Sequence, residues 1–167
     1  MNRASGGDLG DALRARLGNA RRIAVVGVGD ELSPVDRLGM VAAERIGALH
    51  LPGVRVFLAG TVPESMTGPV RRFGPDHVLI LDAADMGAPA GTMAVIDPEH
   101  IAAGLLSTHA LPLAVVMEFL ARESAAGVTL LGIQPDLRDR EGGLTGELPG
   151  SLDQNLRLVS AVLRKRQ

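Results

Sequence analysis

The stretch Arg22-Ile23-Ala24-Val25-Val26-Gly27 decides the fold that this sequence predicts. The run is too short for a helix, and its apolar residues are continuous rather than alternating with polar ones as in a half-exposed strand. Continuous apolar runs of this kind are typical of parallel sheets, because helices cover both faces of such sheets. We therefore expect residues 22–27 to form the first central strand of a sheet.

Outward from this strand, apolar runs alternate with helical patterns along the chain. Further strands are expected at 54–59, 77–81, 92–96 and 128–133. Helices are expected at 9–17, 38–49, 113–122 and 151–166, with a short helical or irregular crossover at 66–74. This alternation predicts an α/β fold with an open, mostly parallel twisted sheet, helices on both faces and a binding site at the carboxyl ends of the strands.

The length of 167 residues is near that of one domain, so we expect a single α/β domain over residues 1–167. In this interpretation residues 1–20 form an N-terminal helical extension. The segment 136–150 is rich in charged residues, Gly and Pro and is expected to be a mobile loop. It leads into Ser151-Leu152-Asp153-Gln154, which has the pattern of a capping box at the start of the last helix.

The composition excludes several classes of function. The formal net charge is -2 and aromatic residues make up 2% of the chain, so a broad basic surface and stacking side chains for nucleic acid are both missing. The sequence contains no cysteine, which excludes disulfides, thiol nucleophiles and thiolate metal sites. Any metal must therefore be held by His and carboxylate side chains.

The sequence also lacks the signals of a secreted or membrane-bound protein. A bilayer span needs about 18 or more consecutive apolar residues, and no such segment occurs. The polar residues 1–7 lead into no apolar run of the kind that a secretory signal requires. We therefore expect a soluble, cytoplasmic protein with no membrane partner.

Three ionisable residues follow predicted strands, where an open α/β sheet brings functional groups together. Asp36 comes nine residues after the first strand, Asp82 ends the third strand, and His109 precedes the next long helix. Two carboxylates and one imidazole suit a borderline divalent metal such as nickel or zinc, and they leave positions open for a substrate group. These three are the candidate catalytic and metal-binding residues.

Each candidate also has a structural interpretation. Asp36 could cap the helix that begins near residue 37, and Asp82 could cap the turn after its strand. His109 could be a histidine that is hydrogen-bonded within its loop. Three other histidines are weaker candidates because of their places in the pattern: His50 at a helix end, His77 at a strand start and His100 in a turn.

Nucleotide binding is only weakly indicated. Gly27-Val28-Gly29 follows the first strand as a phosphate-binding turn does, but the dinucleotide pattern needs a third glycine where this chain has Leu32. The Gly-Lys-Ser/Thr of a P-loop and the Gly-x-Ser-x-Gly of serine hydrolases are both missing. A glycine pair of this kind more often permits a tight turn between strand and helix.

Five motifs resemble, in the same order, those of the hydrogenase maturation endopeptidases, and most closely the branch that serves the hydrogenase 3 large subunit. They are Gly27-Val-Gly-Asp30, Gly60-Thr-Val-Pro-Glu64, Leu79-Ile-Leu-Asp-Ala-Ala-Asp-Met-Gly87, Ser107-Thr-His-Ala-Leu-Pro112 and Leu131-Gly-Ile-Gln-Pro135. The most specific are Asp-Ala-Ala-Asp-Met-Gly and Leu-Gly-Ile-Gln-Pro. The likeness runs from Ile23 to the final helix.

The resemblance implies a compact α/β enzyme that removes the C-terminal extension from the precursor of a [NiFe]-hydrogenase large subunit after nickel insertion. It implies that the nickel is carried by the precursor and serves as the recognition element. The two acids and the histidine that the family uses to sense the metal match Asp36, Asp82 and His109. Glu64 is a further candidate, which could orient His109 or be an ordinary exposed acid.

The chain departs from the family around the first acid, where Gly-Asp-Asp-Gly is usual and Pro34-Val35-Asp36-Arg37 stands here. Pro34 fixes its own φ, and Arg37 puts a cation beside the candidate ligand. Asp30 replaces the usual Asn and could restore a carboxylate nearby. The altered loop leaves open an alternative function, that of a non-catalytic relative that binds the metallated precursor as a chaperone or adaptor.

Overall fold

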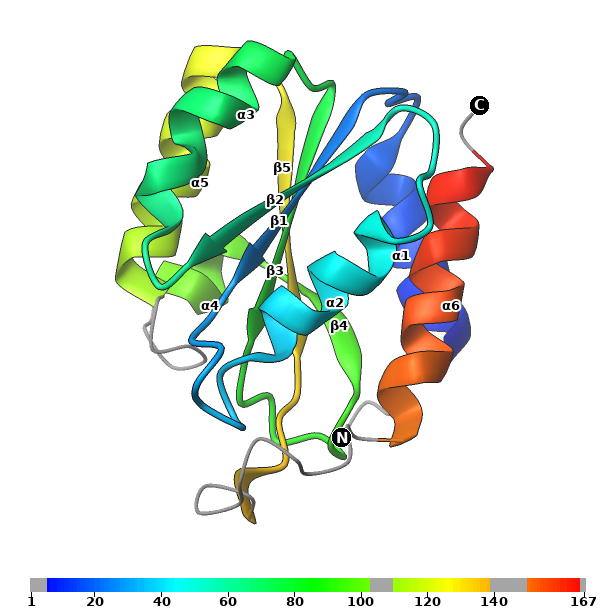
Figure 1. Ribbon diagram of the computed structural model, residues 1–167. Helices are drawn as coiled ribbons and strands as arrows, with labels where there is room; N and C mark the ends of the chain where they lie inside the picture. Colours follow the sequence, from blue (N-terminus) through cyan, green and yellow to red (C-terminus); the bar gives the residue numbers. More distant parts are fainter. Residues whose placement is uncertain (1–5, 103–109, 139–149, 166–167) are drawn as a thin grey trace.

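The computed structural model describes residues 6–102, 110–138 and 150–165. At its centre is a five-stranded sheet with the order β2-β1-β3-β5-β4. The strands are β1 (Ile23–Val28), β2 (Val54–Gly60), β3 (His77–Ala83), β4 (Met93–Ile96) and β5 (Gly127–Ile133). The first three and β5 run parallel, whereas β4 is antiparallel to β5 (Figure 1). The predicted mostly parallel sheet is confirmed.

Helices cover both faces of the sheet, as predicted (Figure 1). One face carries α1 (Gly6–Leu17), α2 (Leu38–Gly47) and α6 (Gly150–Arg164). The other carries α3 (Thr67–Phe73), α4 (Pro98–Ala102) and α5 (Ala110–Ser124), and a short 3-10 helix, η1 (Pro63–Met66), precedes α3. Of the helices described, none is long and apolar enough to cross a membrane.

The strand β1 serves the cores on both faces, because all six of its residues are buried. Val25 packs into the core beneath α1, α2 and α6, and Val26 packs into the core beneath α3 and α5. Complete burial of a Val side chain contributes about 1.5–3 kcal/mol relative to its exposure. The continuous apolar run at 22–27 therefore reflects burial on both sides of the sheet.

The predicted elements are present, with shifted ends. The N-terminal helix α1 packs against α6 and β4, and its leucines are buried in the same core as Val25, so it is an integral part of the fold. The strand β3 extends two residues beyond its predicted end, which puts Asp82 inside the strand. The helix α4 was not predicted, because five residues are too few to show a helical period.

The capping box predicted at Ser151 is wrong. The helix α6 begins at Gly150, so Ser151 already lies within it, and its hydroxyl donates a hydrogen bond to the carbonyl oxygen of Ala90 at 2.7 Å. Asn155 Nδ2 likewise donates to the carbonyl oxygen of Gly91 at 2.9 Å. These side chains tie α6 to the loop before β4. The predicted mobile loop at 136–150 falls mostly on residues 139–149, which lie outside the described part of the chain.

The first turn of α2 lies directly on the carboxyl ends of β1 and β3. A Cβ atom at Gly39 would come within 2.2 Å of the carbonyl oxygen of Val28 and within 2.3 Å of that of Leu81. Glycine is required here because a side chain of any size would overlap two strand carbonyls. This contact fixes the loop between β1 and α2 relative to the end of β3.

Replacing Gly39 with Ala is expected to lower the free energy of unfolding by about 2 kcal/mol or more, because the added methyl group overlaps backbone that cannot move aside. Gly47→Ala, in the last turn of the same helix, is the matched control. Its Cβ would lie 3.3 Å from a methyl group of Val56, so a change of less than about 1 kcal/mol is expected. Urea unfolding followed by circular dichroism measures both, and equal stabilities would contradict the steric explanation.

At the opposite end of the sheet, Asp76 joins the segments that lead into β1 and β3. Its Oδ2 atom accepts hydrogen bonds from the backbone N–H of Arg22 at 2.7 Å and of Arg21 at 2.9 Å. The hydrogen bond from Arg22, and after it the one from Arg21, holds the pKa of Asp76 below its ordinary value of 3.8. The N–H of Asp76 in turn donates to the carbonyl oxygen of Arg22 at 2.7 Å.

Asp76→Ala is expected to reduce stability at neutral pH by about 1 kcal/mol, because two backbone N–H groups lose their acceptor. Because folding lowers the pKa of Asp76, its carboxylate contributes to stability at any pH above the ordinary pKa of 3.8. This contribution disappears as the pH falls through the lower pKa of the folded state. The variant and the native chain should therefore converge in stability in acid. Asp11→Ala, which removes an exposed ion pair with Arg14, is the control and should cost less than about 1 kcal/mol. A constant stability gap across the acid range would refute the role of the charge.

Candidate functional site

The direction in which the chain winds reverses between β1 and β3. From β1 the chain passes through α2, which covers one face of the sheet, to β2, which lies beside β1 on the side away from β3. From β3 it passes through β4, α4 and α5 to β5, on the other side, with α5 over the other face. In open α/β proteins, ligands bind outside the carboxyl ends of the strands at such a switch point. Asp36 lies in the loop after β1 and Asp82 is the second-last residue of β3, so both candidate acids belong to this point of the sheet.

Asp36 lies in a loop built from successive tight turns. The N–H of Ser33 donates to the carbonyl oxygen of Asp30 at 3.0 Å, and the N–H of Arg37 donates to that of Ser33 at 2.9 Å. Gly29 has a φ of 141°, and a Cβ there would lie 1.9 Å from the carbonyl oxygen of Asp36. The loop therefore folds back on itself so closely that only glycine is possible at position 29.

The carboxylate of Asp36 helps to hold this loop, rather than acting as the N-cap of α2. Its Oδ2 atom accepts a hydrogen bond from the backbone N–H of Asp30 at 3.1 Å. The N-cap of α2 is Arg37, in helical conformation and with no capping hydrogen bond from its side chain. The alternative that Asp36 is the capping residue of that helix is therefore wrong. Asp36 is half-buried, which leaves part of the side chain accessible.

Asp82 is 1% exposed, near the end of the fully buried strand β3. Side chains alternate along a strand, so Asp82 shares a face with Val78 and Ile80, whose core includes α5. Its neighbour across the β3–β5 ladder is Gly132, which has no side chain to cover it. Removing a carboxylate from water is costly unless it gains hydrogen bonds or a cation. A buried acid at this place in the sheet is therefore the stronger of the two candidates on geometry.

His109 lies outside the described residues, as do the other residues from 103 to 108. The helix α5 begins one residue later, and its first turn lies at the end of the molecule where the parallel strands terminate (Figure 1). Within the described ranges, no three His, Asp or Glu side chains group as a metal site would require. The three-residue set Asp36, Asp82 and His109 stays a prediction from the sequence.

The weaker histidine candidates contribute nothing to this site. His77 is buried at the start of β3, at the opposite end of the sheet, where its Nε2 atom lies 2.8 Å from the hydroxyl oxygen of Thr129. His50 and His100 are exposed on a helix end and on α4. Glu64 is exposed on η1, and its suggested contact with His109 concerns a residue outside the described ranges.

Sequence analysis gave no role to Gln134, yet the structure assigns it a central place. The residue follows β5 and is 3% exposed. Its Oε1 atom accepts hydrogen bonds from the N–H of Met86 at 2.6 Å and of Ala88 at 3.3 Å. The signal that could have revealed it is a polar amide directly after an apolar strand, because a buried amide must find partners. Gln134 joins the two most specific sequence motifs, Asp82–Gly87 and Leu131–Pro135.

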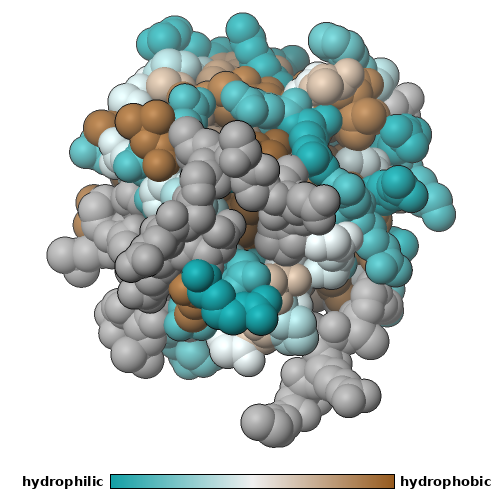
Figure 2. Space-filling model, turned by 60° about the horizontal axis from the view of Figure 1, so that its bottom comes forward, coloured by the Kyte–Doolittle hydropathy of each residue, from teal (hydrophilic) through white to brown (hydrophobic). Residues whose placement is uncertain are grey.

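The surface around this end of the sheet carries both hydrophilic and hydrophobic residues (Figure 2). The loop that contains Asp36 also presents Leu32, which is 78% exposed, and the exposed acid Glu31. An edge of this kind offers acidic and apolar groups together.

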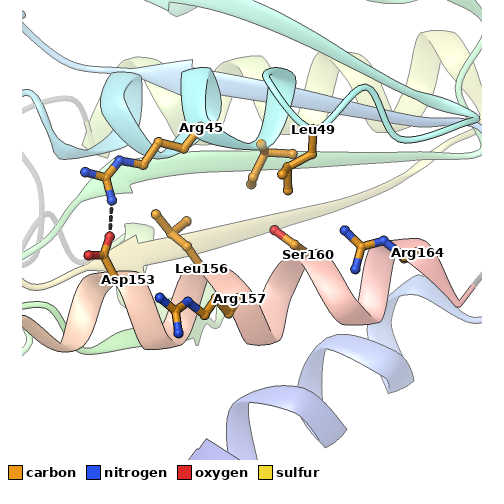
Figure 3. A pocket seen from close by; sticks show the side chains of 8 residues that line it. Arg45, Leu49, Asp153, Leu156, Arg157, Ser160 and Arg164 are labelled. Atoms are coloured by element: carbon orange, nitrogen blue, oxygen red, sulfur yellow. Dashed lines mark hydrogen bonds and ion pairs between the residues drawn. The ribbon is translucent and has the colours of Figure 1, made fainter.

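A groove of about 370 Å³ lies elsewhere, between α2 and α6 (Figure 3). Its floor includes Leu49 and Leu156, and Arg157 and Arg164 lie along its α6 side. Asp153 is the one acid among the residues that line it, and it forms an ion pair with Arg45 across the groove. This groove holds no pair of carboxylates, so we place the candidate site at the switch point.

The chain is thus an α/β protein with an open sheet and with a buried and a half-buried acid on the strand and loop that flank its switch point. Residues 41–162 match the model of a family described as hydrogenase maturation protease. Over 111 residues the chain is 35% identical to the hydrogenase 3 maturation protease of Escherichia coli K12. The aligned residues make up 66% of this chain and 70% of that protein.

Two solved structures extend the likeness to the fold. The crystal structure of the [NiFe] hydrogenase maturation protease HycI from Thermococcus kodakarensis has a TM-score of 0.72 and 27% identity, covering 93% of this chain and 97% of that one. The hydrogenase maturating endopeptidase HybD from Escherichia coli has a TM-score of 0.62 and 28% identity, covering 86% and 93%.

The chain belongs to the hydrogenase maturation protease family, and it is a peptide hydrolase. The resemblance found in its five motifs is confirmed. Asp82 and His109 fall within the residues that match the family model, whereas Asp36 lies before the first matched residue. The part of the chain that departs from the usual family pattern is therefore also the part that the family model does not cover.

Proposed function

We propose that this chain is the endopeptidase that removes the C-terminal extension from a [NiFe]-hydrogenase large-subunit precursor after nickel has been inserted. Membership of the protease family supports the reaction class. The observation that carries the proposal is that Asp36 lies in the loop after β1 and Asp82 in the last two residues of β3, the two strands that flank the switch point. A cytoplasmic location stays a prediction of the sequence.

In this proposal the precursor brings its own nickel, bound to its cysteine thiolates, to Asp36, Asp82 and His109. Carboxylate oxygen and imidazole nitrogen are ligands that nickel accepts. Asp82 is suited to this role because a buried carboxylate gains more from a nearby cation than an exposed one does. Asp36, held by the N–H of Asp30, would approach the same ion from the loop after β1.

The nickel then acts as a checkpoint on the substrate. A precursor that contains the metal is anchored through it, and its scissile bond is held where reaction can occur. A precursor without nickel lacks this anchor, so the same enzyme surface positions it poorly. Selectivity for the loaded precursor follows from binding geometry, without a separate sensing domain.

Hydrolysis adds a water oxygen to the scissile carbonyl carbon, and a proton must pass to the leaving amine. Two routes remain open at this site. The nickel could polarise the carbonyl oxygen, or one of the two acids could take the proton from water and later give it to the amine. Both routes use the same residues. Assignment of the aspartates as the proton-transfer groups is therefore part of the proposal.

The decisive experiment is the incubation of the purified chain with the large-subunit precursor, with and without nickel. We expect the mass of the nickel-loaded precursor to fall by that of its C-terminal extension, while the nickel-free precursor remains intact. A complex that forms without any change in mass would instead support the adaptor alternative. Equal cleavage of both precursors would exclude the checkpoint.

Asp82→Asn and His109→Ala are expected to lower kcat/KM for the loaded precursor by at least about 100-fold, because each removes a group that contacts the metal or transfers a proton. Asp153→Asn is the matched control, since this exposed acid pairs with Arg45 in the groove away from the site. It should leave cleavage unchanged. Circular dichroism of all three variants establishes that they are folded, and full activity of folded Asp82→Asn would remove Asp82 from the mechanism.

A further inference from the structure

One buried side chain, that of Gln134, holds the first part of the loop after β3. After β3 ends at Ala83, the N–H of Ala84 still donates to the carbonyl oxygen of Ile133 at 2.9 Å, which continues the pairing with β5. Beyond it the loop depends on Gln134. The N–H groups of Met86 and Ala88 both donate to Oε1 of this residue, at 2.6 and 3.3 Å.

These two bonds fix the orientation of the Gln134 amide. A backbone N–H can only donate, so the atom that receives both bonds must be the amide oxygen. The amide nitrogen Nε2 then donates to Oδ1 of Asp85 and to the carbonyl oxygen of Pro135, each at 3.3 Å. A carboxylate can only accept, so donor and acceptor match on both sides of the amide.

Asp85 is exposed, but the position of its carboxylate is constrained. The N–H of Gly87 donates to the same Oδ1 atom at 3.2 Å, in addition to the bond from Gln134. No cationic side chain in the described ranges pairs with Asp85. The hydrogen bonds to Asp85 engage Oδ1, so Oδ2 is the oxygen that can accept from another molecule.

The backbone of Gln134 adds further rigidity to the same corner. Its N–H donates to the carbonyl oxygen of Thr92, and its own carbonyl oxygen accepts from the N–H of Gly91, both at 2.8 Å. Side chain and backbone together bond to residues on both ends of the segment between β3 and β4. The segment that contains Asp85 is therefore positioned by β5, the strand that also pairs with Asp82.

We propose that Gln134 is a positioning residue for precursor binding: it holds the exposed carboxylate of Asp85, three residues beyond Asp82, so that this carboxylate accepts a hydrogen bond from the precursor as it docks. This inference rests on the proposed function. A carboxylate that is already ordered loses less conformational freedom on binding than a mobile one, so its contribution falls on affinity rather than on the chemical step. Gln134 itself does not touch the substrate.

Gln134→Glu is the informative variant. It keeps an acceptor for Met86 and Ala88 but replaces the donor to Asp85 with a second carboxylate oxygen. At neutral pH the two carboxylates repel, and we expect the KM for the nickel-loaded precursor to rise about tenfold with kcat nearly unchanged. Two facing carboxylates retain a proton to higher pH than either does alone. The ratio of variant to native KM should therefore fall as the pH is lowered from about 8 to about 5, because a shared proton restores the bond to Asp85.

Asp85→Ala provides the test of the pathway. It should raise KM by a similar factor. In its presence Gln134→Glu should have a much smaller further effect on KM, since of the two acceptors of Nε2 only the carbonyl oxygen of Pro135 then faces the new carboxylate. Thr129→Val is the matched structural control. It removes a buried hydrogen bond with His77 near the other end of β5, so it should lower the Tm and leave KM unchanged.

The affinity of each variant for the nickel-loaded precursor, measured by titration, gives a readout that does not require cleavage. A native chain that binds but does not cleave would contradict the proposed endopeptidase and still allow this comparison. The positioning role would be overturned if Gln134→Glu keeps the KM and the affinity of the native chain. It would also be overturned if this change has the same effect whether Asp85 is present or replaced with Ala. A loss in Tm alone, as in Thr129→Val, would reduce Gln134 to a structural residue.

Discussion

The contact of the first turn of α2 with the ends of β1 and β3 is the constraint on which the rest of the structure depends. Gly39 lets the helix begin against the carbonyl oxygens of Val28 and Leu81, and Gly29 lets the preceding loop fold back onto the backbone of Asp36. These two glycines lie outside the stretch Pro34–Arg37, which departs from the usual family pattern. Gly29 before this stretch and Gly39 after it allow the close backbone contacts that the loop needs, so the altered stretch need not contain glycine itself.

The two acids at the switch point differ in their surroundings, and the difference suits them to different roles. Asp82 is enclosed and lies on a strand paired on both sides, so its position is set by the sheet. Asp36 is half-buried on a loop and is secured through the N–H of Asp30. A rigid buried acid and an accessible loop acid can meet an incoming cation from two sides.

The fold was predictable from the sequence where burial leaves a simple pattern. The runs at 23–27 and 78–81 are apolar throughout because both faces of β1 and β3 are covered, and that same pattern made Asp82 conspicuous. The antiparallel direction of β4 and the existence of α4 were not predictable, because four or five residues carry too little periodicity. The capping box failed because Ser151 bonds to Ala90, a residue remote in sequence. Gln134 was missed for the same reason, since its role appears only when β5 lies beside the loop after β3.

The short reversed strand β4 has a consequence for how the molecule meets other copies of itself. A sheet that ended on a long parallel strand would offer a row of backbone donors and acceptors to any extended chain. Here one border is only four residues long and is packed by α1, while the other, β2, carries the charged Arg55 among its apolar residues. The border at β4 therefore discourages edge-to-edge aggregation, and Arg55 places a charge on the longer border at β2.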